Sequence, residues 1–144
     1  DRTIAINLRG TYLTLHLSVP HLKKRGGSIV VVSSINGTRT FTTPGATAYS
    51  ATKAAQLAMV QQLALELGRY RIRINAVCPG VIRTAMLNSH PHLAEFEPKL
   101  LALHPAGRLG EIEEVVNAVL WLASDGASFM HGSLMTVDGG WTAA

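Results

Sequence analysis

Apolar residues along this chain fall into two alternating patterns. Short runs rich in β-branched side chains, bounded by glycine-containing turns, predict three strands, at 28–34, 72–78 and 133–137. Longer stretches with helical periodicity predict three main helices, at 2–24, 48–69 and 111–124. Pro20 should bend or end the first of these helices. Because strands that alternate with helices form parallel sheets, the pattern predicts an α/β fold.

The region 80–106 departs from this alternation. It contains three prolines and only two weak helical stretches. Long segments between regular elements tend to carry binding function, so we expect residues 85–106 to form a lid over a ligand pocket. The apolar side chains expected to line that pocket are Met86, Leu87, Leu93, Phe96, Leu100 and Leu101. The charged side chains expected to face solvent are Glu95, Glu97 and Lys99.

The composition is that of one folded domain. The 144 residues are 47% hydrophobic, which is enough for a single core. No apolar run reaches membrane length without a charge or a breaker, and no basic and apolar leader opens the chain. The single cysteine, Cys78, excludes an internal disulfide and suits a reducing compartment, so we expect a cytoplasmic protein. The six histidines are dispersed, and we expect no catalytic metal.

The net charge of +4 supports a second hypothesis, a non-catalytic scaffold or a nucleic-acid-binding module. The densest basic patches, at 69–73 and 23–25, both fall where a predicted helix gives way to a strand. Cations at a helix C-terminus are favoured by the helix dipole. The sequence has no basic stripe with interleaved aromatic residues. We therefore expect no nucleic-acid partner and keep this function as the alternative.

Tyr49 and Lys53 are the first candidates for chemistry. They stand four residues apart at the start of the helix predicted over 48–69, so they share one face of it. A phenol alone keeps its proton too tightly to act as a general base near neutrality, and a nearby ammonium favours the phenolate. The pair therefore suits proton exchange with a substrate. Taken alone, the spacing also fits a packed ring beside a solvated lysine.

Two further polar positions precede this pair. Ser33 and Ser34 follow the apolar run 29–32, at the carboxyl end of a predicted strand, where open α/β sheets hold their ligands. A turn in which the hydroxyls satisfy backbone groups is the alternative, and we expect it for one of the two serines. Asn7 lies inside a helical pattern, where an amide is a poor choice unless it caps, bends the helix or binds something.

In this order, these residues resemble the short-chain dehydrogenase/reductase family. The motifs are Asn7, Ser34 in Ser-Ser-x-x-Gly, Tyr49-x-x-x-Lys53 and Asn75-Ala76-Val77-Cys78-Pro79-Gly80. The tail is similar too, with Gly107-Arg108-Leu109-Gly110 before a helix and Val137-Asp138-Gly139-Gly140 near the end. The resemblance covers essentially the whole chain and is strongest to the branch with 3-oxoacyl-carrier-protein reductases. It implies a Rossmann-like, doubly wound parallel sheet.

The chain departs from the family pattern in two places. The interval from Ser34 to Tyr49 is fifteen residues, longer than is common, and the common interval would select Asn36. We keep Ser34 because it stands at the strand end before Gly37, and we place the extra length within 38–43. The chain also has no glycine-rich turn to receive a dinucleotide pyrophosphate. The resemblance then implies that residues 1–144 are the C-terminal part of one domain, without its dinucleotide-binding half, and inactive alone.

The resemblance implies an NAD(P)-dependent oxidoreductase that interconverts a secondary alcohol and a ketone by hydride transfer. Tyr49 would be the acid/base, and Lys53 would favour its phenolate and bind the ribose hydroxyls of the coenzyme, so both would also contact it. Ser34 would donate a hydrogen bond to the substrate oxygen. Asn7 would hold a water that links Lys53 to solvent, with a structural role as the alternative.

The resemblance also implies how NAD or NADP and partner subunits are bound. The remaining cofactor-binding residues would be Pro79, Gly80, Ile82 and Thr84. Gly80 has no Cβ, so the backbone there could approach the nicotinamide ring, although Pro-Gly would also make a plain turn. The helices at 2–24 and 48–69 would pair with symmetry mates in a homotetramer. The apolar composition of residues 85–106 separately suits a small-molecule substrate, a medium-sized carbonyl or alcohol with an apolar portion, better than a bare polyol.

Overall fold

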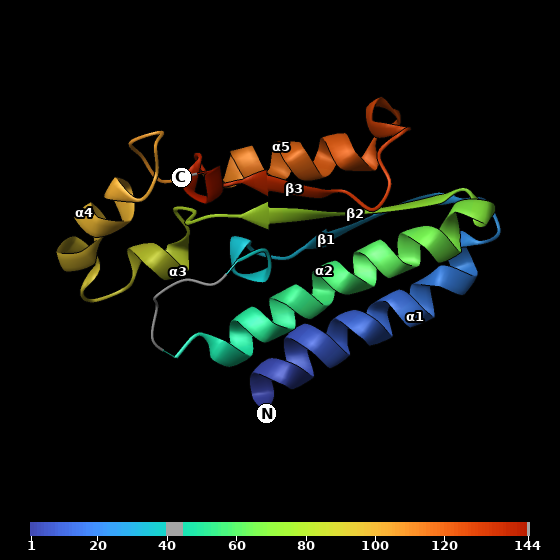
Figure 1. Ribbon diagram of the computed structural model, residues 1–144, viewed down its shortest axis with the longest axis horizontal. Coiled ribbons are helices and arrows are strands. Elements are labelled where there is room, and N and C mark those ends of the chain that lie inside the picture. Colours follow the sequence, from blue (N-terminus) through green and yellow to red (C-terminus); the bar gives the residue numbers. More distant parts are fainter. Residues whose placement is uncertain (40–44, 144) are drawn as a thin grey trace.

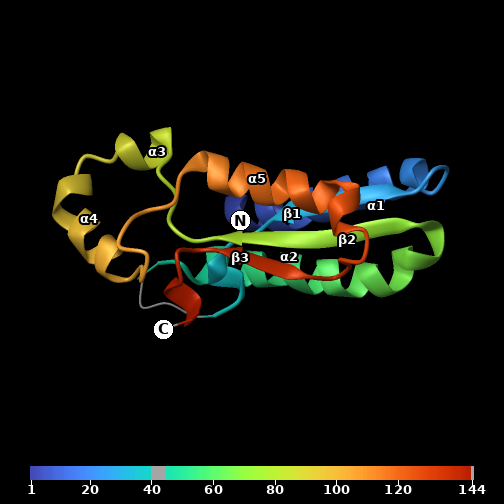
Figure 2. The same cartoon turned by 90° about the horizontal axis from the view of Figure 1, so that it is seen from above.

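A three-stranded parallel sheet runs through the middle of the computed structural model, which describes residues 1–39 and 45–143 (Figure 1). The strands are β1 (Gly27–Val32), β2 (Ile72–Pro79) and β3 (Leu134–Val137), in that spatial order. Seen from above in Figure 2, the sheet lies between α5 on one side and α2 on the other. The fold is therefore the Rossmann-like α/β arrangement that the alternating pattern predicts.

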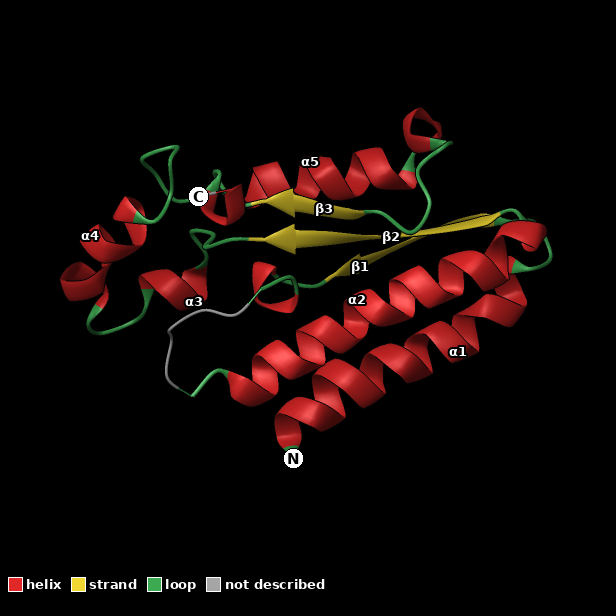
Figure 3. Ribbon diagram, viewed as in Figure 1, coloured by secondary structure: helices red, strands yellow, loops and turns green. Residues whose placement is uncertain are grey.

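The helices agree with the predicted ranges to within a few residues. A π-helical stretch, η1 (Ile4–Gly10), leads directly into α1 (Thr11–Leu22). Pro20 lies inside α1, which ends two residues after it. The other two long helices are α2 (Thr47–Leu67) and α5 (Ile112–Ala123). The two weak helical stretches of the lid are α3 (Ala85–Asn88) and α4 (Leu93–Ala102). Figure 3 shows both beyond the carboxyl ends of the strands.

Successive side chains of strand β2 point to opposite faces of the sheet, and both faces are packed. Ile74, Ala76 and Cys78 belong to the core cluster beneath α1 and α2. Val77 belongs to a second cluster beneath α5, together with Leu122. All five of these side chains are fully buried. The strand alternates apolar and polar residues over 72–76, yet the face that carries Asn75 and Val77 is buried as well.

Asn75, the first residue of one family-like motif, has a structural role. Its side chain is fully buried on β2. Its Nδ2 donates to the Met130 carbonyl at 2.9 Å, and its Oδ1 accepts from the Ser133 amide at 2.9 Å. A buried amide with both ends paired fixes the loop that leads into β3.

Helix α5 begins with a capping box. The Glu114 carboxylate accepts from the Glu111 amide at 2.8 Å, and the Glu111 side chain accepts in return from the first turn. The Arg108 guanidinium donates to both Glu114 oxygens, at 2.7 and 2.8 Å. The Arg108 and Glu111 hydrogen bonds lower the pKa of Glu114 to about 2.

We expect Glu114→Gln to destabilise the protein near neutrality, and the difference from wild type to shrink as the pH falls toward 2. The folded-state pKa lies below the unfolded one, so the stability that this carboxylate adds is present above the unfolded value and is lost through about pH 2. Thermal unfolding across this range measures the effect. Glu113→Gln, an exposed neighbour in the same turn, is the matched control. Equal effects of both variants near neutrality would contradict the prediction.

The structure can be compared with the sequence on membrane-spanning helices, on metal ligands and on the insertion before Tyr49. None of the described helices is long and apolar enough to span a bilayer. Within 1–39 and 45–143, no three His, Cys, Asp or Glu side chains gather as metal ligands would. Most of the insertion placed within 38–43 lies outside the described residues.

Candidate active site

The predicted site residues come from one edge of the sheet. In Figure 1 the strand arrows point toward α3 and α4, and η1 and the start of α2 lie near the same end. The Ser33 amide donates to the Val77 carbonyl at 2.8 Å, which joins the end of β1 to the end of β2. The serines and the segment 79–84 therefore follow neighbouring strand ends, as the sequence predicts for a ligand site.

Lys53 is held between α2 and the end of β1. Its Nζ donates to the Val32 carbonyl at 3.2 Å and lies 5.6 Å from the centre of the Tyr49 ring. Burial lowers the pKa of Lys53, although the neighbouring Cys78 acts in the opposite direction. Burial raises the pKa of Cys78 to about 11 against the charge of Lys53, so this cysteine stays a neutral thiol. The ammonium and the phenol thus share one face of α2, as predicted.

The two serines have different partners. Ser33 is buried, and its Oγ donates to the Lys53 carbonyl at 3.0 Å, so this hydroxyl satisfies a backbone group. The Ser34 Oγ accepts from the Asn36 amide at 3.1 Å and donates to Asn36 Oδ1 over a longer 3.4 Å. Ser34 is 8% exposed, and both serines satisfy backbone groups, whereas the sequence predicts this for one of them.

Asn36, which sequence reasoning considered only to reject as the serine position, lies beside the site. Its Nδ2 donates to Ser50 Oγ at 3.3 Å, next to Tyr49 on α2. The turn that carries it packs very closely on the helix. A Cβ at Gly37 would lie 2.8 Å from the Lys53 carbonyl, so only glycine fits there. Ser34 and α2 are therefore held at a fixed separation.

Asn7 reaches α2 from the π-helical stretch. Its Nδ2 donates to Thr52 Oγ1 at 3.3 Å, and Thr52 Oγ1 donates to the Tyr49 carbonyl at 2.8 Å. Sequence reasoning missed Thr52 and Gln56, which is also buried. The available signal was their spacing, because residues 49, 52, 53 and 56 share a helix face and three of them are polar in an otherwise apolar stretch.

The segment after β2 is bonded to the loop before α5. Gly110 donates to the Val81 carbonyl at 3.0 Å and accepts from the Arg83 amide at 2.8 Å. Ile82 lies between Val81 and Arg83, so its own main-chain N–H and C=O point away from Gly110. Thr84 caps α3, since its Oγ1 accepts from the Leu87 amide at 3.3 Å.

Gly80 has a packing role that the sequence did not indicate. A Cβ there would lie 2.9 Å from the Cα of Asp138. The missing side chain thus makes room for the chain that leaves β3, so this glycine is required by the fold itself.

Two expectations about the lid need correction. Glu97 forms an ion pair with Arg83 instead of facing solvent alone, because the turn after α3 brings α4 back over the segment 79–84. Met86 is 83% exposed and lines no interior in this structure. The base of the lid is held by His104, which was grouped with the dispersed histidines. It is buried, its Nδ1 lies 2.6 Å from the Leu100 carbonyl, and it packs edge-on against Trp141.

The chain is similar to known proteins over nearly its whole length. A family profile described as enoyl-(acyl carrier protein) reductase matches residues 1–142. The 3-oxoacyl-acyl-carrier-protein reductase FabG of Thermotoga maritima is 41% identical over 141 residues, which are 97% of this chain and 56% of that protein. The chain thus spans just over half the length of this relative.

Solved structures show the same relation. A 3-ketoacyl-ACP reductase from Sinorhizobium meliloti 1021 is 56% identical, with a TM-score of 0.83 over 98% of this chain and 58% of the other. The structure of ElxO with NADP bound is 33% identical, with a TM-score of 0.88 over 96% of this chain and 56% of the other. Both likenesses extend over nearly all of the α/β fold described above.

Proposed function

Since the chain belongs to the short-chain dehydrogenase/reductase family, we propose that it supplies the catalytic half of an oxidoreductase that interconverts a secondary alcohol and a ketone. The observation that carries the proposal is the placement of Tyr49 and Lys53 on one face of α2. Asn7 is bonded to the same helix, and Ser34 is linked to it through Asn36. We call a protein that contains this chain together with a dinucleotide-binding half the full-length protein.

The side chains have complementary roles in this reaction. Bound NAD or NADP accepts or supplies the hydride. Tyr49 takes the hydroxyl proton when an alcohol is oxidised and returns it to the carbonyl oxygen when a ketone is reduced. Lys53 favours the phenolate through its charge, and Ser34 donates to the oxygen on which negative charge develops. Asn7 takes part in returning the proton to solvent.

The chain fits one end of such a coenzyme. The Lys53 ammonium suits the ribose hydroxyls, and the outward peptide groups of Ile82 suit a carboxamide, beside Pro79, Gly80 and Thr84. The sequence offers no glycine-rich turn for the pyrophosphate. We propose that this second contact is made by the dinucleotide-binding half, and that the chain alone is inactive.

We propose a substrate with a carbonyl near an apolar portion, such as a 3-oxoacyl thioester. Two of the similar proteins are named as reductases of that class. The half-buried apolar residues of the lid suit such a chain better than a bare polyol. A kinetic comparison of an acetoacetyl thioester with a sugar alcohol, in each coenzyme, tests the proposal. A clear preference for the sugar alcohol would overturn the substrate class and leave hydride transfer standing.

The remaining proposals concern location and partners. A cytoplasmic enzyme without a nucleic-acid partner suits the lone buried Cys78 and the positions of the basic residues. Lys23 and Arg69 both stack on Tyr70, at 4.3 and 4.8 Å from the ring centre, where α2 ends. A scaffold or nucleic-acid-binding module would have no need for the Tyr49–Lys53 geometry.

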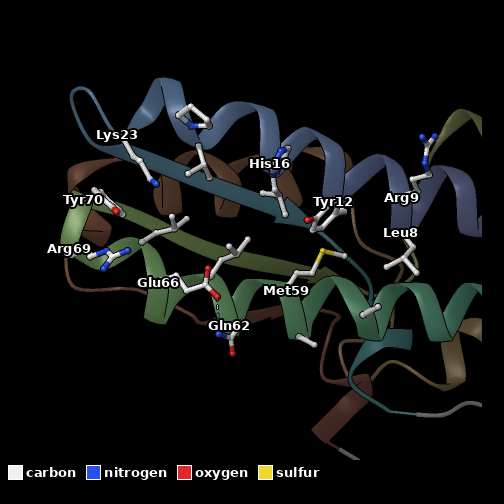
Figure 4. Close-up of a pocket in the computed structure, with 17 residues that line it drawn as sticks. Leu8, Arg9, Tyr12, His16, Lys23, Met59, Gln62, Glu66, Arg69 and Tyr70 are labelled. Atoms are coloured by element: carbon white, nitrogen blue, oxygen red, sulfur yellow. Dashed lines mark hydrogen bonds between the residues drawn. The ribbon is translucent and has the colours of Figure 1, made fainter.

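A groove between α1 and α2 supports self-association of the full-length protein. Figure 4 shows side chains from both helices along it, including Tyr12, His16 and Met59. Its lining is largely apolar, and the exposed fractions of Tyr12 and of nearby Leu17 are 55% and 65%. Exposed apolar patches of this kind are typical of interaction sites. We propose that two such helix pairs meet here in a homotetramer.

Ala58→Glu should weaken this association, because Ala58 lines the groove, is exposed and would place a charge between the paired helices. Sedimentation of the full-length protein should show a tetramer for wild type and smaller species for the variant. Gln61→Glu, on the same helix but outside the groove, should leave the tetramer intact. A wild-type protein that sediments as a monomer at micromolar concentration would refute the proposal.

A further inference from the structure

Asn36 lies in the short turn η2 (Ile35–Gly37), which main-chain contacts hold in place. The Asn36 amide donates to Ser34 Oγ at 3.1 Å, and the Gly37 amide donates to the Ser34 carbonyl at 3.0 Å. On its other side the turn packs against the main chain of Lys53, where a Cβ at Gly37 would lie 2.8 Å away. None of these contacts uses the Asn36 side chain, so the turn does not depend on it.

The Asn36 carboxamide spans the space between the end of β1 and the start of α2. Its Oδ1 lies 3.4 Å from Ser34 Oγ, and its Nδ2 donates to Ser50 Oγ at 3.3 Å. Both distances are long for hydrogen bonds to a hydroxyl, and the residue is half-buried. An amide nitrogen carries two N–H groups, and the second has no partner within 1–39 and 45–143. Asn36 therefore retains a donor that a ligand can use.

This donor stands beside the atoms that would hold the reacting oxygen. In the proposed reaction Ser34 and Tyr49 bind the ketone oxygen. The Asn36 carboxamide contacts Ser34 Oγ on one side and, on the other, Ser50, the residue that follows Tyr49 on α2. In a 3-oxoacyl thioester one methylene separates the ketone from a second carbonyl. Two oxygens so close together match two neighbouring donors, and a few well-placed polar groups of this kind set the specificity of a largely apolar pocket.

We propose that Asn36 is a specificity-determining residue, whose Nδ2 donates to the second carbonyl of a 3-oxoacyl substrate while Ser34 and Tyr49 hold the ketone. The inference rests on the proposed function and assigns a residue to its substrate class. A simple ketone has no acceptor for this N–H. Because Asn36 is half-exposed, water can then take the place of the missing carbonyl. The preference is therefore worth the net value of one hydrogen bond, about fivefold in kcat/KM.

The test compares two substrates in the full-length protein. One is the acetoacetyl thioester of N-acetylcysteamine, and the other is the thioether ketone in which a methylene replaces the thioester carbonyl. Asn36→Leu, which keeps the size of the side chain and removes its donors, should lower kcat/KM for the thioester about fivefold and leave the thioether ketone unchanged. The ratio of the two values cancels their different intrinsic reactivities. Asn117→Leu, an exposed asparagine on α5, should keep the wild-type ratio.

Asn36→Asp provides a second variant of nearly the same shape. Aspartate keeps an acceptor for the Ser50 hydroxyl and loses the amide donor, so the ratio should fall as it does in Asn36→Leu. Thermal unfolding of both variants establishes that they are folded. An unchanged ratio in the folded variants, or equal losses for both substrates, would overturn the inference and leave the oxidoreductase function standing. Absence of turnover of both substrates by wild type would refute the proposed function, and the inference with it.

Discussion

Tyr49→Phe should abolish turnover by the full-length protein, with a loss in kcat of about 10³-fold or more, while the fold is unchanged. General acid–base catalysis typically contributes about 10²–10⁴-fold, and here one hydroxyl carries the proton in both directions. The phenol is 39% exposed and stands at the open end of α2, so its removal leaves no buried polar group unpaired. Steady-state oxidation of NADH or NADPH, followed beside thermal unfolding, measures both effects.

The control is Tyr70→Phe, which makes the same chemical change at the far end of α2. There the ring, and not the hydroxyl, carries the contacts with Lys23 and Arg69. This variant should keep the wild-type rate. A Tyr49→Phe protein with a near-normal rate would remove Tyr49 from the mechanism, although the family assignment would stand.

The 144-residue chain by itself should bind NADH and NADPH at least about 10²-fold more weakly than the full-length protein. The pyrophosphate contacts that we assign to the dinucleotide-binding half are charge-assisted, and two of them at about 1.5 kcal/mol each already account for this factor. Titration of each coenzyme by calorimetry, with the chain alone and with the full-length protein, makes the comparison. Tight binding by the chain alone would contradict the assignment.

The same chain should associate or dissolve poorly. Within the described residues, β1 forms an edge of the sheet, and Val32 at its end is 48% exposed. Leu120 and Trp121 on α5 are 61% and 44% exposed. Unpaired strand edges and exposed apolar surfaces promote association. Light scattering that shows a dispersed monomer at micromolar concentration would contradict this expectation.

The regular elements could be predicted from the sequence because each depends on local patterning. The runs rich in β-branched residues form β1, β2 and β3. The stretches with helical periodicity form the helices on either side of the sheet. The π-helical form of η1 was not predictable from periodicity, and neither was the hydrogen bond that the Asn7 carbonyl there accepts from Gln56, almost fifty residues away. The Arg83–Glu97 pair was missed for the same reason, since it depends on how α4 folds back.

The sequence predicts the contacts of some candidate site residues better than those of others. Tyr49 and Lys53 share a helix face, which follows from spacing alone, so their proximity was predictable. The sequence places both serines at a strand end, but it does not indicate that each hydroxyl bonds to a main-chain group. Gly80 was assigned to a ligand ring, whereas its missing Cβ faces Asp138, a contact between distant segments. Distant contacts of this kind leave no periodic signal in the sequence.

Transfer of a labelled hydride is the most direct test of whether the full-length protein reduces a ketone with NADH or NADPH. The full-length protein is given NADPH or NADH that carries deuterium at the reactive carbon, together with an acetoacetyl thioester, and the product alcohol is analysed by mass spectrometry. The account predicts one deuterium on the carbinol carbon with wild type and none above background with Tyr49→Phe. Wild-type protein that forms no labelled alcohol from any carbonyl tested would contradict it.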